Sequence, residues 1–345
     1  MAAVNIRVLV VDDSPLFRTF IKKELDALDG IDVVDVAQNA SDAKEKILRL
    51  KPDVVTLDVE MPGMNGIEFL KSFIPTNPIP VIVVTSSPTS AFDAVSAGAL
   101  DFVKKPSASN KDELNKFIIR MSTLIRYAKI AKLNPKKTQP KSGDVPVAPL
   151  TIAGTPRSNL VIALGASTGG TEALVEVVKR FPSNTPPVLI TQHMPPTFTK
   201  MFAERLNRIS GMSAKEAEDG DRVVPGQIIV AAGSMQMQLR KDSRGYYITS
   251  RPGEKVSGHC PSVDVLFSSV AETAGANAIG AIFTGMGADG AEGLLKMRKA
   301  GAYTIGQDEE TCVVYGMPGV AYKKGAVMTQ LPLQKIAEHI IMKVK

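Results

Sequence analysis

Short apolar runs rich in Val and Ile alternate with amphipathic stretches along most of this chain, and this rhythm limits the fold more than any other feature. The earlier runs are "IRVLVVDD", "VVDVAQ", "DVVTLD", "PVIVVT" and "LDFVKKP". The later runs are "LVIALG", "PVLITQH", "QIIVAAG", "AIGAIFTG" and "AYTIGQ". Strands that alternate with helices are typical of a parallel sheet with helices on both faces. We therefore expect an α/β architecture with doubly wound, mainly parallel sheets.

The two groups of runs are separated by a segment of different composition. It begins as the tail of a helix and continues as "NPKKTQPKSGDVPVAPLTIAGTPRSN", whose Pro, Ser, Thr and Gly content is typical of an interdomain linker. A chain of 345 residues with 44% hydrophobic residues is long enough for two full cores. The sequence therefore predicts a first domain over residues 1–125, a linker over 126–157 and a second domain over 158–345.

The net charge of +6 does not indicate a nucleic-acid partner. Five lysines fall in the acid-free stretch "KIAKLNPKKTQPK", and the remainder of the chain is nearly neutral. The chain has no Trp and only 5% aromatic residues, so it lacks a basic face with interleaved aromatic side chains. We expect no nucleic-acid binding.

The apolar runs are also too short for a membrane protein. A helix needs about 20 apolar residues to cross a bilayer, and no stretch approaches that length. The N-terminal "MAAVNIRVLVVDDS" reaches acidic residues without the apolar core of a signal peptide. The sequence predicts a cytoplasmic protein without membrane insertion. Its two cysteines, Cys260 and Cys312, are too few for a disulfide framework or a thiolate zinc site.

Polar residues follow the strands of the first domain at the points where they end. Asp12 and Asp13 end the first strand, Asp58 the third, Thr85 the fourth and Lys105 the fifth. The carboxyl ends of parallel strands share one edge of a sheet, where ligands bind. A single strand-end aspartate is more often a solvated turn or a helix cap. Because five such residues should converge, we interpret this edge as a binding site.

The residue types at this edge fit phosphoryl chemistry. Several carboxylates in one pocket repel each other unless a cation neutralises them, and oxygen ligands at a partly hydrated site suit Mg²⁺. Asp58 could then act as a nucleophile that forms an acyl phosphate. Lys105 would place a positive charge on the phosphate, and the Thr85 hydroxyl would donate a hydrogen bond to it.

The motifs "VVDDS", "TLDVEMPGMNG", "VVTSS" and "DFVKKP" resemble those of the receiver domain of two-component response regulators, a flavodoxin-like fold, over roughly residues 5 to 125. The resemblance implies that a chemotaxis histidine kinase phosphorylates Asp58. It implies that Asp13, Asp58 and the Glu60 carbonyl hold Mg²⁺, with Asp12 nearby. Phe102 stands where the family has its switch aromatic residue, and Thr85 and Lys105 stand at its other switch positions.

The second domain carries a serine in a glycine-rich turn between a predicted strand and a predicted helix. "GASTG" fits G-x-S-x-G, in which glycines allow a sharp turn that exposes the serine. Ser167 could be a nucleophile. The stretch "GASTGGT" could instead bind a phosphate, although it lacks the usual lysine before Thr171. Ser167 or Thr168 could also simply cap the following helix.

A nucleophilic serine needs a base, and His193 ends the strand "PVLITQH", one strand-helix-strand unit after Ser167. Such a unit puts both residues at the same edge of a sheet. As an isolated residue, His193 would be interpreted as a hydrogen-bonded packing residue, but its strand-end position favours a functional role. His259, in a predicted loop, and His339, on the C-terminal helix, are expected at the surface.

An acid that orients the base is expected in the glycine-rich loop "TGMGADGAEG". We prefer Asp289 there, although its spacing to Glu292 also resembles a helix capping box. Asp264 and Asp308 are competing acids. The order Ser, His, Asp differs from that of the α/β-hydrolases, so the motif does not predict that fold.

The motifs "LGASTGG", "TQHMPPTFTKMFAERLN", "PSVDVLF", "FTGMGADGAEG" and "CVVYGMPGVA" together resemble the catalytic domain of the chemotaxis protein-glutamate methylesterases, in a Rossmann-like fold. The resemblance implies Ser167 as nucleophile, His193 as general base and then acid, and Asp289 as orienting acid. It places Thr168 and Met286 around the active site, with the Met286 N–H as an oxyanion donor. No metal or other cofactor is expected at this site.

The resemblance further implies what the chain acts on. Its substrates would be glutamate methyl esters on methyl-accepting chemoreceptors, with methanol released, and receptor glutamines would be deamidated by the same chemistry. Phosphorylation of Asp58 would reposition a receiver that otherwise blocks the active site. Two other interpretations stay open: a receiver fused to a phosphoryl- or nucleotide-binding module, and a scaffold that only docks on receptors.

Overall fold

The structure is a computed structural model that describes residues 5–107, 110–129, 131, 148–157 and 159–345. The chain divides into two compact units, Met1–Gly143 and Asp144–Lys345. Each unit is a parallel-sheet α/β domain, as the alternating pattern predicts.

The first unit is built on one parallel sheet. Its strands run in the order β2-β1-β3-β4-β5, and each neighbouring pair is parallel. The strands are β1 (Ile6–Val11), β2 (Ile31–Ala37), β3 (Val54–Asp58), β4 (Val81–Thr85) and β5 (Asp101–Lys104). All five expected strands are therefore confirmed, in flavodoxin-like order.

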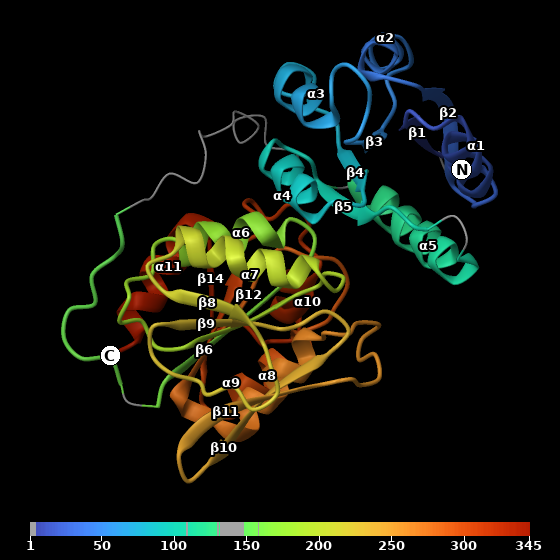
Figure 1. The fold of residues 1–345 in the computed structure, drawn as a ribbon. Coiled ribbons are helices and arrows are strands. Elements are labelled where there is room, and N and C mark those ends of the chain that lie inside the picture. The colour runs from blue at the N-terminus through green and yellow to red at the C-terminus, as the bar shows by residue number, and fades with distance from the viewer. Residues whose placement is uncertain (1–4, 108–109, 130, 132–147, 158) are drawn as a thin grey trace. The chain divides into compact units, whose positions relative to one another are not determined.

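Helices cover both faces of this sheet (Figure 1). α1 contacts α5 on one face, and α3 contacts both α2 and α4 on the other. The helices are α1 (Pro15–Asp26), α2 (Ala40–Leu50), α3 (Gly66–Phe73), α4 (Pro88–Ser96) and α5 (Lys111–Ala128). At the start of α1, the Ser14 hydroxyl accepts a hydrogen bond from the Phe17 N–H, and Pro15 takes the first helical position.

The second unit has a larger parallel sheet in the order β14-β13-β12-β6-β7-β9-β8. Its strands are β6 (Val161–Ala166), β7 (Val188–Gln192), β8 (Ser213–Glu216), β9 (Gln227–Val230), β12 (Ala278–Ile282), β13 (Tyr303–Gln307) and β14 (Thr329–Leu331). The five expected strands are confirmed. The sheet also contains β8 and β14, which the sequence pattern did not indicate because both are short, partly exposed edge strands.

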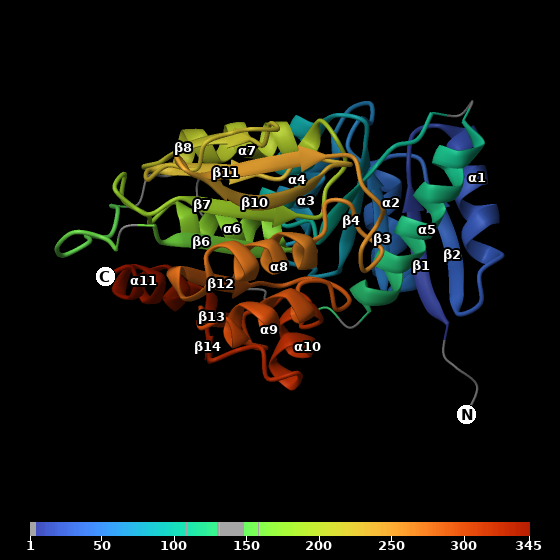
Figure 2. The ribbon, with the colours of Figure 1, turned by 90° about the horizontal axis from the view of Figure 1, so that it is seen from below.

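Two layers of helices flank this second sheet, as Figures 1 and 2 show. α6 contacts α7 and α11 in one layer, and α9 contacts α8 and α10 in the other. The helices are α6 (Gly170–Val178), α7 (Phe198–Ile209), α8 (Val263–Thr273), α9 (Ala291–Lys299), α10 (Met317–Lys323) and α11 (Leu333–Lys343), and a 3-10 turn, η1 (Gly275–Asn277), precedes β12.

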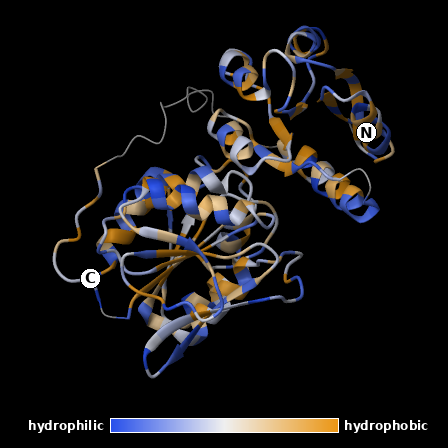
Figure 3. Cartoon of the chain, viewed as in Figure 1, coloured by the Kyte–Doolittle hydropathy of each residue, from blue (hydrophilic) through white to orange (hydrophobic). Residues whose placement is uncertain are grey.

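An antiparallel hairpin packs outside the second sheet. It consists of β10 (Gln236–Asp242) and β11 (Gly245–Arg251), and β10 contacts α8. Met237, Leu239 and Ile248 of the hairpin belong to the same buried cluster as Leu266 and Phe267 of α8. Figure 3 shows hydrophobic colour on the strands of each unit's sheet.

The predicted linker, residues 126–157, lies partly outside the described residues, because 132–147 are not among them. At its start, α5 continues through Ala128. At its end, residues 148–157 run along the second unit, where the Leu150 N–H donates to the Arg180 carbonyl over 2.8 Å. The Arg157 N–H likewise donates to the Val344 carbonyl over 2.8 Å.

Among the described residues, none of the helices combines the length and the apolar character that crossing a bilayer requires.

The strand order explains where the second unit can bind a ligand. On one side of β6 lie β7, β9 and the edge strand β8, which precedes β9 in the chain, and the chain then crosses to the other side of β6 to add β12, β13 and β14. The order of strands reverses at β6, and such a switch point opens a crevice at the carboxyl ends of the strands. The segments that follow β12, β6 and β7 meet there.

Candidate functional sites

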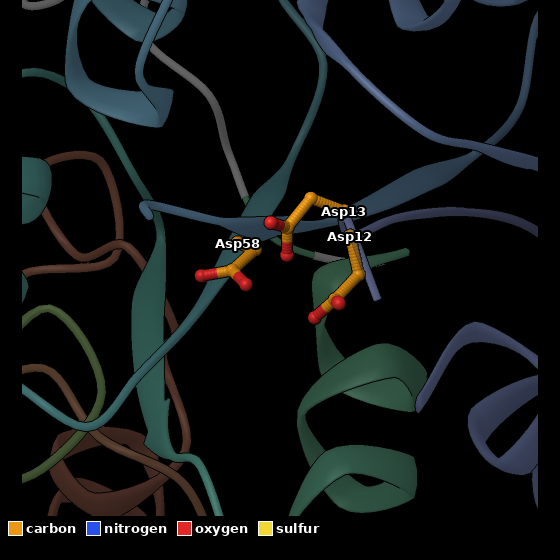
Figure 4. A group of neighbouring side chains, drawn as sticks. All are labelled: Asp12, Asp13 and Asp58. Carbon is orange, nitrogen blue, oxygen red and sulfur yellow. The ribbon is translucent and has the colours of Figure 1, made fainter. Parts of the chain in front are cut away.

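The carboxyl edge of the first sheet brings together the aspartates predicted for it. Ligand oxygens of Asp12, Asp13 and Asp58 all lie within 4.8 Å of one another. Figure 4 shows the three side chains grouped at the strand ends. Asp12 and Asp58 are buried, whereas Asp13 is exposed.

Lys105 closes this cluster with its positive charge. Its Nζ lies 2.8 Å from Asp12 Oδ2 and 2.6 Å from Asp58 Oδ2. Burial raises the pKa of Asp12 to about 6, and the charge of Asp58 acts in the same direction against the hydrogen bonds from Lys105 and Ser14. Burial opposes the charge of Lys105, but its bonds to both carboxylates raise its pKa overall. One cation is thus shared by two buried acids.

This donor set fits a hard divalent cation. Carboxylate oxygens from three residues can converge on one ion, and Mg²⁺ prefers oxygen ligands with open positions for water or phosphate. The backbone at Glu60 is nearby, since its N–H donates to Asp58 Oδ1 over 3.0 Å. The Glu60 side chain is exposed.

The other residues predicted for this edge lie around the cluster. The Thr85 side chain ends β4 and is buried, with its Oγ1 accepting a hydrogen bond from the Ser87 N–H over 3.0 Å. Phe102 is 6% exposed and packs edge-on against Phe92, with ring centroids 6.0 Å apart.

The second candidate site begins with the register of β6 and β7. Ala166 pairs with Gln192, so Ser167 and His193 are the next residues on two adjacent parallel strands. The His193 N–H continues the ladder by donating to the Ala166 carbonyl over 3.3 Å. Because neighbouring strands lie about 5 Å apart, the two residues stand side by side. Ser167 and His193 therefore lie at the same edge of the sheet, as the strand-helix-strand spacing predicts.

Ser167 lies in a turn that the surrounding backbone holds tightly. Its N–H donates to the Thr284 carbonyl over 3.1 Å, and its carbonyl accepts hydrogen bonds from Gly170 N and Gln192 Nε2. The helix-cap interpretation of Ser167 and Thr168 is wrong, because the N-cap of α6 is Gly169, at φ 73°, without a side-chain cap bond. Gly169 adopts this left-handed conformation at little cost.

His193 is bonded to Asp289 and to neither competing acid. Its Nε2 lies 2.7 Å from Asp289 Oδ2, and its side chain is only 5% exposed. Asp264 instead accepts hydrogen bonds from the Gly293 N–H and the Ser257 hydroxyl, and Asp308 accepts them from Thr311. The choice of Asp289 as the acid nearest the base agrees with this geometry.

Asp289 is held ionised at the start of α8. Its carboxylate accepts hydrogen bonds from the Ser262 hydroxyl over 2.7 Å and from the N–H groups of Val263 and Asp264 over 2.8 and 3.0 Å. Burial alone would raise the pKa of Asp289, but the hydrogen bond and charge of His193, with these donors, lower it overall. The capping-box interpretation is wrong, because the N-cap of α9 is Gly290 and has no side-chain cap bond.

An ionised Asp289 fixes the tautomer of His193. A carboxylate only accepts hydrogen bonds, so Nε2 of His193 carries the proton. In a neutral imidazole, Nδ1 then holds the lone pair. His193 Nδ1 is buried and has no hydrogen-bond partner among the described residues. The site therefore presents an unoccupied proton acceptor next to the strand end that carries Ser167.

The loop after β12 covers the turn from the other side. The Thr168 hydroxyl lies 3.1 Å from the Met286 sulfur, and the Thr284 hydroxyl donates to the Thr168 carbonyl over 3.0 Å. Gly285 allows this approach, since a Cβ there would lie 2.8 Å from Ser167 Cβ. The structure thus brings Thr168 and Met286 to the serine turn, as predicted.

One residue beside His193 was not expected there from the sequence. His259, expected at the surface, stacks its ring on His193 with centroids 3.6 Å apart and planes 7° apart. Nothing in the local sequence indicated it, because "SGHCPS" has no periodicity. His339 lies elsewhere, with its Nε2 2.9 Å from the Tyr303 hydroxyl.

Comparison with known proteins follows the same division of the chain. Residues 8–118 match the response regulator receiver domain, and residues 162–340 match the CheB methylesterase family. A protein-glutamate methylesterase/protein-glutamine glutaminase of Syntrophomonas wolfei is 48% identical over 97% of this chain and 96% of its own length. One of the same name from Agrobacterium fabrum is 48% identical over 97% of this chain and 95% of its own.

A solved structure resembles the second unit. The CheB methylesterase catalytic domain of Thermotoga maritima superposes with a TM-score of 0.53 at 37% sequence identity. The match covers 54% of this chain and 99% of that domain.

Proposed function

The chain belongs to the CheB methylesterase family and carries a response regulator receiver domain, and from this premise we propose how its residues perform and control the reaction. The activity is the hydrolysis of glutamate methyl esters on proteins, and the names of its relatives add the deamidation of protein glutamines. The proposed substrates are methyl-accepting chemoreceptors, which would make the reaction a step of chemotactic adaptation.

We assign the chemistry to Ser167, His193 and Asp289. The observation that carries this assignment is the 2.7 Å bond between His193 Nε2 and Asp289, which leaves Nδ1 as the free base nitrogen beside the serine strand. His193 Nδ1 takes the proton of the Ser167 hydroxyl as Oγ attacks the ester carbonyl. The proton then passes to the ester oxygen as the C–O bond breaks and methanol leaves, or to the amide nitrogen as the C–N bond breaks and ammonia leaves. Water, activated by the same nitrogen, releases the glutamate product.

The oxyanion formed in each attack needs hydrogen-bond donors that are already in place. We propose the Met286 N–H for this role, because Met286 borders the serine turn and its N–H has no acceptor in the described structure. Thr168 supports that loop through its hydroxyl contact with the Met286 sulfur. This chemistry assigns no role to a metal.

In the receiver, we propose that a histidine kinase transfers its phosphoryl group to Asp58. The carboxylates of Asp12, Asp13 and Asp58, with the Glu60 carbonyl, would hold the Mg²⁺ that neutralises the incoming charge. Lys105 would pair with the phosphoryl group, and Thr85 and Phe102 would respond to it. Phosphorylation is proposed to raise the rate of ester hydrolysis. We keep the boundaries 1–125, 126–157 and 158–345 and a cytoplasmic location as parts of this proposal.

The test is methanol release from carboxyl-methylated chemoreceptor membranes. Wild type should release methanol, and Mg²⁺ with a small-molecule phosphodonor should raise the rate. Ser167→Ala should lose release by about three orders of magnitude or more while binding the same membranes. Full release by Ser167→Ala would contradict the assignment of the nucleophile, and no release by wild type would contradict the proposed substrate.

A further inference from the structure

The histidine pair at the second site is not explained by the three proposed catalytic residues. The rings of His193 and His259 lie face to face, with centroids 3.6 Å apart and planes 7° apart. Their close and nearly parallel arrangement covers one face of the ring whose Nδ1 we propose as the base. His259 is partly exposed, whereas the His193 side chain is 5% exposed. His259 therefore lies between His193 and solvent on that face.

The backbone around His259 is fixed by several hydrogen bonds. Val256 and His259 exchange N–H to carbonyl bonds of 3.0 and 2.9 Å, which close a short loop. The amide of Gln236, a buried side chain at the start of β10, donates to the His259 carbonyl over 3.2 Å. The same amide group accepts a bond from the Ser262 N–H over 2.9 Å. The backbone at His259 is thus held by the hairpin and the loop, through hydrogen bonds that do not involve His193.

The same short segment holds both partners of His193. Residue 259 supplies the stacked ring, and residues 262–264 supply the three donors that bind Asp289. A change in this segment would alter the contact at the face of His193 and the contact at its Nε2 together. The two contacts constrain different motions of one ring.

The geometry shows what the stack adds. A hydrogen bond at Nε2 fixes one atom of the imidazole, but the ring can still tilt about the line from Cγ to that atom. Such a tilt swings Nδ1 away from the direction of its proton donor. A flat ring at van der Waals distance on one face resists the tilt. A shift of about 1 Å in a reacting group can reduce a rate about a hundredfold.

We propose that His259 is a positioning residue of the hydrolase site, whose flat ring holds the plane of His193 in the orientation in which Nδ1 can accept the proton of the Ser167 hydroxyl. The role belongs to the aromatic face and not to a nitrogen of His259. It rests on the proposed esterase mechanism, in which the proton moves from Ser167 Oγ to His193 Nδ1. The aromatic face of His259 also lies against the ring that becomes an imidazolium in that step.

Three variants separate a flat ring from mere volume. His259→Ala removes the ring, His259→Leu restores apolar volume without a flat face, and His259→Phe restores a flat face without a titratable nitrogen. We expect Ala and Leu to lower kcat for methanol release about ten- to a hundredfold with KM nearly unchanged. Phe should return kcat to within about threefold of wild type. Thermal unfolding of each variant shows whether it is folded at the temperature of the kinetic assay.

A spectroscopic measurement follows His193 itself. The chain has three histidines, so a sample labelled with ¹⁵N-histidine gives three imidazole signal sets. In wild type and His259→Phe, the Nε2–H of His193 should give a resolved downfield proton signal, because the ring is held against Asp289. In the Ala and Leu variants the signal should broaden through ring motion and exchange. This readout does not depend on any substrate.

Several results would overturn the proposal. If His259→Phe is as inactive as His259→Ala, a nitrogen of His259 takes part in the chemistry. If Ala and Leu keep wild-type kcat, or lose only thermal stability, the stack has no role in positioning the base. If wild type itself releases no methanol, the proposed function fails, and the Nε2–H signals of the four proteins still decide whether the stacked ring orders His193.

Discussion

At the scale of single residues, the second site depends on the hydrogen bonds that keep the buried carboxylate of Asp289 ionised. Asp289 receives hydrogen bonds from His193, from the Ser262 hydroxyl and from two N–H groups of α8, and this set outweighs the cost of its burial. The negative charge at the start of α8 is also favoured by the helix dipole. A charged Asp289 in turn determines which nitrogen of His193 can act as a base.

Replacing the Asp289 carboxylate by a neutral amide should therefore impair His193 as a base, although His193 itself is still present. We expect Asp289→Asn to lower kcat for methanol release by about 10³- to 10⁴-fold, since an amide no longer enforces one tautomer of His193. Asp308→Asn is the matched control, because Asp308 bonds to Thr311 and not to His193. Steady-state kinetics of both variants make the test, and similar losses in the two would count against a specific role for Asp289.

The lowered pKa of Asp289 also predicts a dependence of stability on pH. A carboxyl whose pKa is lower in the folded state contributes stability above its unfolded pKa of about 3.9 and loses it as the pH falls through the folded pKa. Between about pH 5 and about pH 2.5, wild type should lose more free energy of unfolding than Asp289→Asn. Denaturant titrations at several pH values measure the difference, and parallel curves would refute the assignment.

At the scale of elements, the strand pattern predicted most of the fold. Apolar runs with Val and Ile indicated ten strands correctly, because parallel strands buried on both faces must be continuously hydrophobic. The polar edge strand β8 and the short β14 carry no such signal. The sequence pattern also did not indicate the hairpin β10–β11. One of its faces is exposed to solvent, and the apolar residues of the other face pack on α8.

The candidate sites could be predicted only in part for a related reason. Residues that end strands, such as Asp58, Ser167 and His193, are placed by topology, which the sequence pattern reveals. His259 and the donors to Asp289 lie on a loop and a helix end, whose positions depend on tertiary hydrogen bonds such as those of Gln236. No local periodicity encodes those contacts.

The close packing of the serine turn against the loop after β12 gives an element-scale prediction. In Gly285→Ala the new Cβ would lie 2.8 Å from Ser167 Cβ, 3.0 Å from Ser167 N and in collision with the Met317 sulfur. The turn must move, so we expect kcat for methanol release to fall about tenfold or more. Kinetics with folded protein, verified by circular dichroism, test this.

Gly325→Ala provides the control for backbone strain. Gly325 has φ 72° and open space where a Cβ would stand, so the substitution costs about 1–2 kcal/mol of stability without touching the site. Its kcat should match wild type. If both glycine variants lose activity equally, general destabilisation explains the effect of Gly285→Ala.

At the scale of the whole molecule, each unit carries a separate chemistry at the carboxyl edge of its own sheet. The first offers clustered carboxylates with a shared lysine, and the second offers a serine, a histidine and a buried acid. The receiver is useful only if its modification changes the rate at the other unit. Methanol release with and without a phosphodonor measures that coupling.

We expect Asp58→Asn to abolish the stimulation of methanol release by Mg²⁺ and a phosphodonor, while release without the donor continues. An amide at residue 58 cannot form an acyl phosphate and contributes no charge to the cation site. Asp32→Asn, at an exposed position of β2, should keep full stimulation. Persistent stimulation of Asp58→Asn would mean that another residue receives the phosphoryl group or that the donor acts elsewhere.

The strand order of the second sheet also determines when the hydrolase site can form during translation. β6, which leads to Ser167, lies between β7 and β12, and β12 is made more than 100 residues after β6. When the receiver has left the ribosome, β12 has not yet been made, and one edge of β6 is still unpaired. Asp289, which bonds to His193, is also still missing. The hydrolase therefore comes into being only with the last part of the chain, after its own control unit is complete.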